Sequence, residues 1–193
     1  MNHEIPVEEF FRKEEKTDFK LSPNGTHVAY MRPFERRMNI VVQKIGEPQE
    51  HFITEDVDRD IYQFFWINNQ RIGYFKDEGG DENIRLFAID ITKENLKELT
   101  PFDNVCARLI DDCENDPDHV IVGLNKDDPR IHDAYRLNVN TGELACIAKN
   151  SGHISAWLTD HDYKLRCAMV TDGVKTSILI RDNEESEFEE LIT

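Results

Sequence analysis

An internal repeat of about 45 residues constrains the fold of this 193-residue chain more than any other feature. A triplet in which a small residue stands between two larger apolar residues occurs four times. The copies are Val28-Ala29-Tyr30, Ile72-Gly73-Tyr74, Val122-Gly123-Leu124 and Cys167-Ala168-Met169. Their small residues are 44, 50 and 45 positions apart. That spacing is the length of one four-stranded blade of a β-propeller.

Each triplet is followed at a nearly constant distance by a β-branched or aromatic run, which is typical of a strand. These runs are Ile40-Val41-Val42, Ile84-Arg85-Leu86, Tyr135-Arg136-Leu137 and Ile178-Leu179-Ile180. A third run closes each unit, at 51–54, 97–100, 146–148 and 191–193. Turn sequences fall between the runs, at Pro23-Asn24-Gly25, Gly79-Gly80-Asp81, Asn140-Thr141-Gly142 and Asp182-Asn183.

The repeat predicts an all-β protein of four propeller blades, a part of a seven- or eight-bladed ring. We expect one partial propeller domain over 1–193, with a lead-in segment at 1–16 that carries a short helix over Val7 to Lys16. The expected blades span 17–56, 57–103, 104–150 and 151–193. Ala29, Gly73, Gly123 and Ala168 are expected on inner strands with no room beside them. A β-sandwich is the alternative, although a sandwich has no reason to repeat its triplets at this interval.

The formal charge of −16 argues against nucleic-acid and membrane-surface partners, because both are bound through clustered Lys and Arg. No run approaches the roughly 20 apolar residues of a spanning helix, and Met1 to Arg12 lacks the order of a signal peptide. We therefore expect a soluble protein. A cytoplasmic and a periplasmic location both stay open.

Serine hydrolases of the α/β type hold their nucleophile in a Gly-x-Ser-x-Gly turn. None of the five serines has glycine two positions away on both sides; they are Ser22, Ser151, Ser155, Ser177 and Ser186. Adjacent acids such as Glu184-Glu185 point in different directions and do not form a catalytic pair. We therefore predict no catalytic residue in this chain.

The sequence also predicts no metal site and no cofactor site. The segment from Asp111 to His119 is rich in oxygen ligands, yet it lacks the alternation of acids followed by glycine found in calcium loops. A solvated acidic loop is the favoured interpretation. His153 and His161 fit no zinc pattern, and Gly79-Gly80 lacks the surroundings of a phosphate-binding loop. The cysteines Cys106, Cys113, Cys146 and Cys167 show no CxxC spacing, so we interpret them as buried thiols, with a disulfide still open.

The segments 5–12 and 19–30 resemble the start of bacterial prolyl oligopeptidase family proteins, dipeptidyl aminopeptidases and acylaminoacyl peptidases among them. The Ser22-Pro23-Asn24-Gly25 turn is similar to the one that opens blades in these enzymes and in TolB. The stretch 128–143 is similar to a third blade of the same enzymes. Later blades depart from the turn pattern, as at Trp66 to Gln70 and Trp157 to His161.

The resemblance implies a parent serine exopeptidase whose propeller admits short peptides to a C-terminal α/β-hydrolase domain. On this hypothesis the chain is the non-catalytic gating part, and the hydrolase domain and short peptides are its partners. Incomplete closure of the ring predicts that the chain either self-associates through its open blade edges or has frayed terminal blades. A TolB-like propeller that binds proteins without any hydrolase is the alternative. A sugar-active propeller enzyme is a third hypothesis, and it needs paired carboxylates or metal-binding histidines that face one mouth of the propeller.

Overall fold

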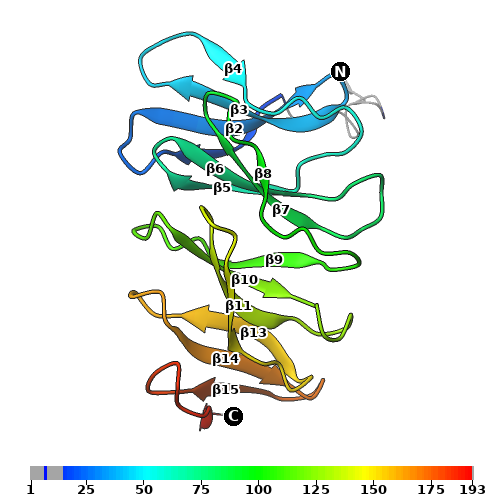
Figure 1. Ribbon diagram of the computed structural model, residues 1–193, viewed down its shortest axis with the longest axis vertical. Coiled ribbons are helices and arrows are strands. Elements are labelled where there is room, and N and C mark those ends of the chain that lie inside the picture. The colour runs from blue at the N-terminus through cyan, green and yellow to red at the C-terminus, as the bar shows by residue number, and fades with distance from the viewer. Residues whose placement is uncertain (1–6, 8–14, 193) are drawn as a thin grey trace, which may run out of the picture.

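The computed structural model describes residue 7 and residues 15–192. Within these residues sixteen strands form four sheets, and in each sheet every strand pairs antiparallel with the next one in sequence. Figure 1 shows the sheets stacked from the N-terminal to the C-terminal end of the chain. We call them blades 1 to 4 in chain order. The all-β architecture of four-stranded blades predicted from the sequence is confirmed.

The strands are short, as is usual for propeller blades. Blade 1 contains β1 (Thr17–Leu21), β2 (His27–Phe34), β3 (Arg37–Lys44) and β4 (Glu50–Phe52), and blade 2 contains β5 (Gln63–Asn68), β6 (Arg71–Lys76), β7 (Arg85–Asp90) and β8 (Lys97–Glu98). Blade 3 contains β9 (Ala107–Asp111), β10 (His119–Leu124), β11 (Asp133–Asn138) and β12 (Leu144–Ala148), and blade 4 contains β13 (Ile154–Thr159), β14 (Leu165–Thr171), β15 (Thr176–Ile180) and β16 (Glu189–Ile192).

The short N-terminal helix predicted over Val7 to Lys16 lies almost wholly outside the described residues and is not borne out. The described chain enters β1 directly after Glu15 and Lys16. The domain bounds and the total number of blades in the ring stay predictions.

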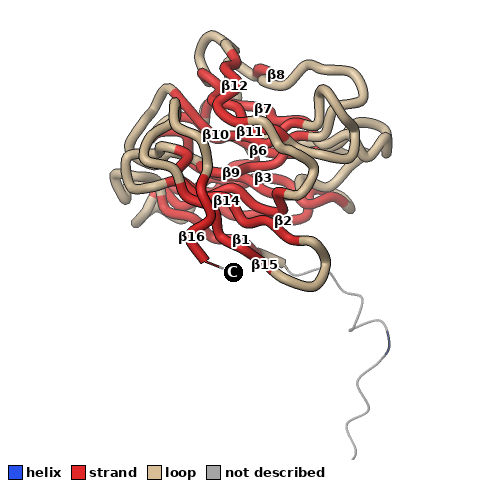
Figure 2. Tube along the Cα trace, turned by 90° about the horizontal axis from the view of Figure 1, so that it is seen from below, coloured by secondary structure: helices blue, strands red, loops and turns tan. Residues whose placement is uncertain are grey.

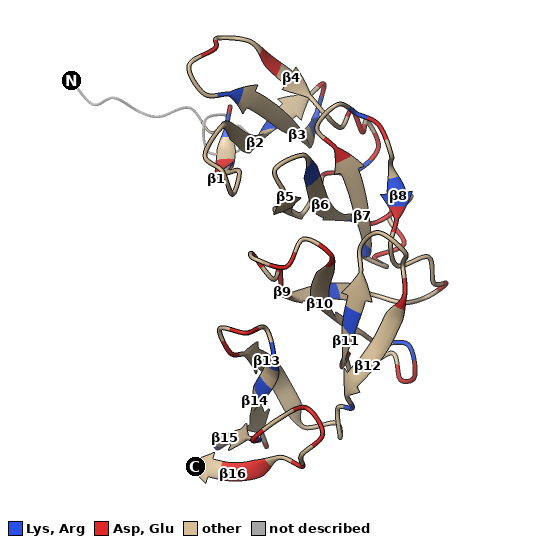
Figure 3. Cartoon of the chain, turned by 60° about the vertical axis from the view of Figure 1, so that its left-hand side comes forward, with Lys and Arg blue, Asp and Glu red and all other residues tan. Residues whose placement is uncertain are grey.

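The four blades form a curved stack. Figure 3 shows the first strands, β1, β5, β9 and β13, along its concave side and β4, β8 and β12 along its convex side. Figure 2, which looks along the stack, shows the strands of the blades superimposed with loops around their ends. Each first strand pairs along one edge only, so its other edge carries N–H and C=O groups that no neighbouring strand of the described chain satisfies.

Two apolar cores hold the first three blades together. One core lies between blades 1 and 2 and contains Ile40, Val42, Phe64, Ile72 and Phe87. The other lies between blades 2 and 3 and contains Phe65, Phe75, Leu86, Leu124 and Leu137. Alternate residues of one strand therefore belong to different cores, since side chains of a strand point alternately to its two faces.

The contact between blades 3 and 4 is more polar. Arg136 on β11 donates to Glu184 Oε1 at 2.9 Å and to the carbonyl of Tyr163 at 3.0 Å. Arg181, only 6% exposed, donates to the carbonyl of Ile147 across the same interface. Blade 4 is also the least covered blade, because no residue of β15 is buried and all of β16 is exposed.

Two predicted turns show why their residues are needed. Gly25, with φ of 67°, donates its N–H to the carbonyl of Ser22 at 2.8 Å, and Asn24 Oδ1 accepts the N–H of Thr26 at 3.1 Å. Gly142, with φ of 82°, closes the β11–β12 turn by donating to the carbonyl of Asn138 at 2.8 Å. Positive φ at these positions favours glycine.

The four small residues of the repeat lie on the second strand of each blade, one strand away from the concave side. In each blade, a residue near the start of the second strand accepts, through its carbonyl, the N–H of the residue that follows the third strand. These acceptors are Thr26, Gln70, Asp118 and Arg166. Ala29 and Gly73 lie three positions after their acceptor residue and Gly123 lies five positions after its own, which are odd separations. Ala168 lies two positions after its acceptor, which is an even separation. Ala168 therefore points to the opposite face from the other three, and the sequence triplets are not strictly equivalent.

The crowding expected beside the small residues differs between sites. A Cβ at Gly73 would lie 2.4 Å from Phe65 Cζ, whereas the nearest atom to a Cβ at Gly123 is His132 Cβ at 3.4 Å. The lack of room at Gly73 comes from an aromatic ring on the adjacent strand of the same blade. Convergence of blades at an axis does not explain it.

Candidate functional site

The acidic segment from Asp111 to His119, which sequence analysis interpreted as a solvated loop, links β9 to β10. Asp111 accepts the N–H of Cys113 at 2.7 Å and the hydroxyl of Thr159. Asp116 lies 3.0 Å from His119 Nδ1. Among the described residues no group of three His, Cys, Asp or Glu is arranged to hold a metal ion. These acids thus organise the loop and connect it to blade 4.

The other residues considered as site candidates do not come together. His153 lies before β13 and His161 after it, and both are exposed. The Ser22 hydroxyl donates to Asn24 Oδ1 at 2.9 Å, and the Ser155 hydroxyl donates to the carbonyl of Met169 at 3.1 Å. Both hydroxyls therefore donate within a local turn or a strand pair.

The cysteines are free thiols, and they differ in burial. Cys113 is buried, and burial raises the pKa of its thiol to about 12, so the thiolate is scarce at neutral pH. Cys106 and Cys167 are half-buried, and Cys146 on the outermost strand β12 is exposed. The expectation of buried thiols therefore holds for Cys113 and is wrong for Cys146.

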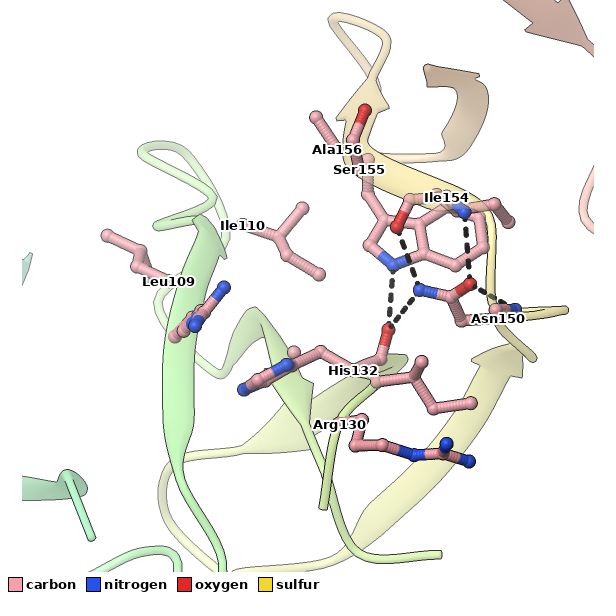
Figure 4. A pocket seen from close by; sticks show the side chains of 13 residues that line it. Leu109, Ile110, Arg130, His132, Asn150, Ile154, Ser155 and Ala156 are labelled. Carbon is pink, nitrogen blue, oxygen red and sulfur yellow. Dashed lines mark hydrogen bonds between the residues drawn. The ribbon is translucent and has the colours of Figure 1, made fainter. Parts of the chain in front are cut away.

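A pocket of about 390 Å³ lies between blades 3 and 4, and sequence analysis did not identify it. One wall is formed by Arg108, Leu109 and Ile110 of β9, and the facing wall by residues 154–157 of β13. The β10–β11 loop forms the floor. Figure 4 shows Leu109 and Ile110 on the β9 side, Ile154, Ser155 and Ala156 on the β13 side, and Arg130 and His132 below.

A hydrogen-bond network around Asn150 fixes the shape of this pocket. The Asn150 side chain donates to the carbonyl of Ile154 at 2.9 Å and accepts the N–H groups of Gly152 at 2.9 Å and Ile154 at 3.1 Å. The indole Nε1 of Trp157 donates to the carbonyl of His132 at 3.2 Å, which ties β13 to the β10–β11 loop (Figure 4). These bonds hold residues 150–154 and β13 against the β10–β11 loop.

The pocket carries one uncompensated positive charge. Arg130 is 84% exposed and forms a two-pronged ion pair with Asp128, at 2.9 and 2.6 Å. Arg108 is exposed, and the described residues offer it no ion pair. Burial, and then the charge of Arg108, hold the pKa of His132 below its usual range, so its ring is neutral at neutral pH. The pocket thus combines a free guanidinium with apolar walls.

The pocket offers apolar contact surface beside a free guanidinium, which suits ligand binding. It brings together residues far apart in sequence; Trp157 and His132, for example, are 25 positions apart. The only sequence signal near it is the stretch Asp128-Pro129-Arg130-Ile131-His132, which carried part of the family resemblance.

None of the described helical segments is long and apolar enough to cross a bilayer.

No protein-family model matches the chain. It is 28% identical over 166 residues to dipeptidyl aminopeptidase BIII of Pseudoxanthomonas mexicana, which covers 85% of this chain and 24% of the relative. It is 25% identical over 173 residues to dipeptidyl peptidase family member 6 of Caenorhabditis elegans, covering 85% of this chain and 23% of that one. The chain thus spans about a quarter of the length of these curated relatives.

Solved structures show the same fold at low sequence identity. Prolyl oligopeptidase B from Galerina marginata matches 91% of this chain with a TM-score of 0.65 at 9% identity, over 26% of its own chain. TolB from Acinetobacter baumannii matches 92% of this chain with a TM-score of 0.55 at 16% identity, over 43% of its own chain. The resemblance found in the sequence is confirmed: this chain is a β-propeller segment similar to those of the prolyl oligopeptidase family, and its sequence relatives are dipeptidyl peptidases.

Proposed function

We propose that this chain is the propeller part of a serine exopeptidase that acts on short peptides, and that it limits access of larger polypeptides to a hydrolase domain. The observation that carries the proposal is the sequence match to two dipeptidyl peptidases over 85% of the chain. The curved stack supports it, because its concave side exposes four strand edges along which a narrow peptide can pass (Figure 3).

The hydrolase chemistry belongs to a separate domain in this proposal. The purified 193-residue chain is then expected to release no p-nitroaniline above buffer from alanyl-alanine or N-acetylalanine p-nitroanilide. Turnover that follows the chain through purification would contradict the non-catalytic role.

The gating role is tested by exchange into a relative. In dipeptidyl aminopeptidase BIII, the matching segment is replaced by this chain, and a second version simply lacks the segment. The exchanged enzyme should cleave dipeptide substrates and spare casein, whereas the deletion version should cleave casein. Active-site labelling with a fluorophosphonate shows that both hydrolase domains are intact. Equal cleavage of casein by the two labelled enzymes would overturn the gating role.

A TolB-like protein-binding module is the second candidate, and the match of TolB to 92% of the chain favours it. The reading frame downstream of Thr193 separates the candidates. Further blades followed by a Gly-x-Ser-x-Gly sequence are expected for the peptidase, and a stop codon is expected for the binding module.

A further inference from the structure

The pocket between blades 3 and 4 has a charge that stands out in this acidic protein. The chain carries a formal charge of −16, yet Arg108 has no ion-pair partner among the described residues. Asp128 compensates Arg130, and the ring of His132 is neutral. Asp133, the acid that follows His132, is engaged by Lys149 at 2.9 Å and by the N–H of Asn150 at 2.7 Å. The guanidinium is therefore free for one singly charged anion.

The walls of the pocket indicate what the anion is attached to. Ile110, Ile131, Ile154 and the indole of Trp157 contribute apolar surface. A volume of about 390 Å³ lies near the lower end of the range for small-molecule sites, roughly 300–1,000 Å³. This space suits one amino-acid residue with an apolar side chain.

The strands at the pocket add a third feature. β9 pairs only with β10, and β13 only with β14, and the two first strands lie beside each other. Their free edges lie along the concave side of the stack, beside the pocket, and present main-chain N–H and C=O groups there (Figure 3). Such edges bind peptide main chain by strand addition, which a fatty acid or an inorganic anion cannot exploit.

We propose that this pocket binds the C-terminal residue of a short peptide, with its carboxylate on Arg108, its apolar side chain against Ile110 and Trp157, and its main chain on a free edge of β9 or β13. The guanidinium fork matches a carboxylate in two-pronged geometry. The site recognises a peptide by its end, and the inference does not depend on the gating function.

The test uses the full chain and two matched probes, N-acetyl-alanyl-leucine and its C-terminal amide. Calorimetry should show binding of the acid and at least about tenfold weaker binding of the amide, because a charge-assisted hydrogen bond is lost. In ¹⁵N-labelled protein, the acid should shift the indole N–H of Trp157, the side-chain amide of Asn150 and the N–H of Gly152.

Two arginine variants locate the charge. R108Q should weaken binding of the acid about tenfold and leave the amide unchanged, whereas R36Q, in the distant β2–β3 turn, should bind both probes like the parent. R108K should fall between R108Q and the parent, since it keeps the charge and loses the fork. Arg108 is exposed and unpaired, so the variants should fold, and an unchanged far-UV spectrum checks this.

Three results would overturn the proposal. They are no binding of the acid, equal affinities of acid and amide, and a folded R108Q that binds the acid like the parent.

Discussion

The ring of Phe65 on β5 lies over Gly73 on β6, its direct cross-strand partner. A Cβ at Gly73 would lie 2.4 Å from Phe65 Cζ, closer than real Cβ contacts come. Phe65 is 2% exposed and packs in the core between blades 2 and 3, so the ring has little freedom to move aside. The glycine is therefore needed because an aromatic side chain from the adjacent strand occupies its space.

Replacing Gly73 with alanine should overpack this contact and lower the free energy of unfolding by about 1–3 kcal/mol. Urea denaturation measures the change as a lower midpoint at constant slope. Gly123→Ala is the matched control, because its nearest neighbour would be at an ordinary 3.4 Å. It should be neutral or slightly stabilising.

A double variant separates the contact from backbone effects. In a Phe65→Leu background the ring is gone, so Gly73→Ala should cost less than it does in the parent. An equal cost in both backgrounds would show that Phe65 is not the cause.

The pair of Arg136 and Glu184 should anchor blade 4 to blade 3. Both side chains are less than one-fifth exposed, and Glu184 Oε1 also accepts the N–H of Leu165 at 3.0 Å. R136Q leaves the mostly buried carboxylate without its cation, so the free energy of unfolding should fall by about 1–3 kcal/mol. Amide exchange in β14 should rise with it.

R130Q is the control for this pair. Arg130 is also ion-paired, but it is 84% exposed, and such surface pairs contribute little. Comparable losses in the two variants would contradict an anchoring role for Arg136.

The carboxyl group of Asp112 should destabilise the fold at neutral pH. Burial, and then the charge of Asp111, raise its pKa above the usual 3.8, so the folded protein binds this proton more tightly than the unfolded chain does. The ionised group therefore costs stability above its folded pKa, and this cost disappears as pH falls below 3.8.

D112N should consequently raise the melting temperature slightly at pH 7 and leave it unchanged near pH 3. Because the site is only partly buried, the gain should be on the order of a few tenths of a kcal/mol. Asp103 is an exposed acid in the β8–β9 loop, and D103N is the control for removing one negative charge from this acidic chain. An equal gain at both pH values would contradict an electrostatic cause.

The sequence predicts the blades well because a strand and its hairpin depend on neighbouring residues. The β-branched run Ile40-Val41-Val42 lies in β3, and the turn residues Asn24 and Gly25 lie between β1 and β2. Local spacing does not predict register between strands. The register shifts at Ile154 and at Leu158 alter the pairing of β13 with β14, and no turn signal marks them.

The pocket could not be predicted from the sequence for a different reason. Arg108, His132 and Trp157 belong to a strand, a loop and the next blade, so their proximity depends on how blades 3 and 4 stack. The exposure of Cys146 likewise follows from the place of β12 at the outer side of its blade. Neither fact is contained in hydrophobic periodicity.

Blade 4 should be the least stable part of the chain. The described residues of blades 1 to 3 share two apolar cores, and blade 4 contributes to neither. Blade 1 is better covered although it is also terminal, because Tyr30 is 1% exposed and Val41 is fully buried. In amide hydrogen exchange, β15 and β16 should therefore exchange first and β6 and β10 last.

The exposed face and edge of blade 4 should also drive self-association of this chain. Leu191 and Ile192 on β16 are 62% and 59% exposed, and an uncovered blade buries apolar surface only by finding a neighbour. Light scattering should show a mass that rises with concentration, and Leu191→Lys should restore the monomer. Leu96→Lys, at an equally exposed residue of blade 2, should not. A strict monomer at high concentration, with β16 protected as strongly as β6, would contradict an open terminal blade.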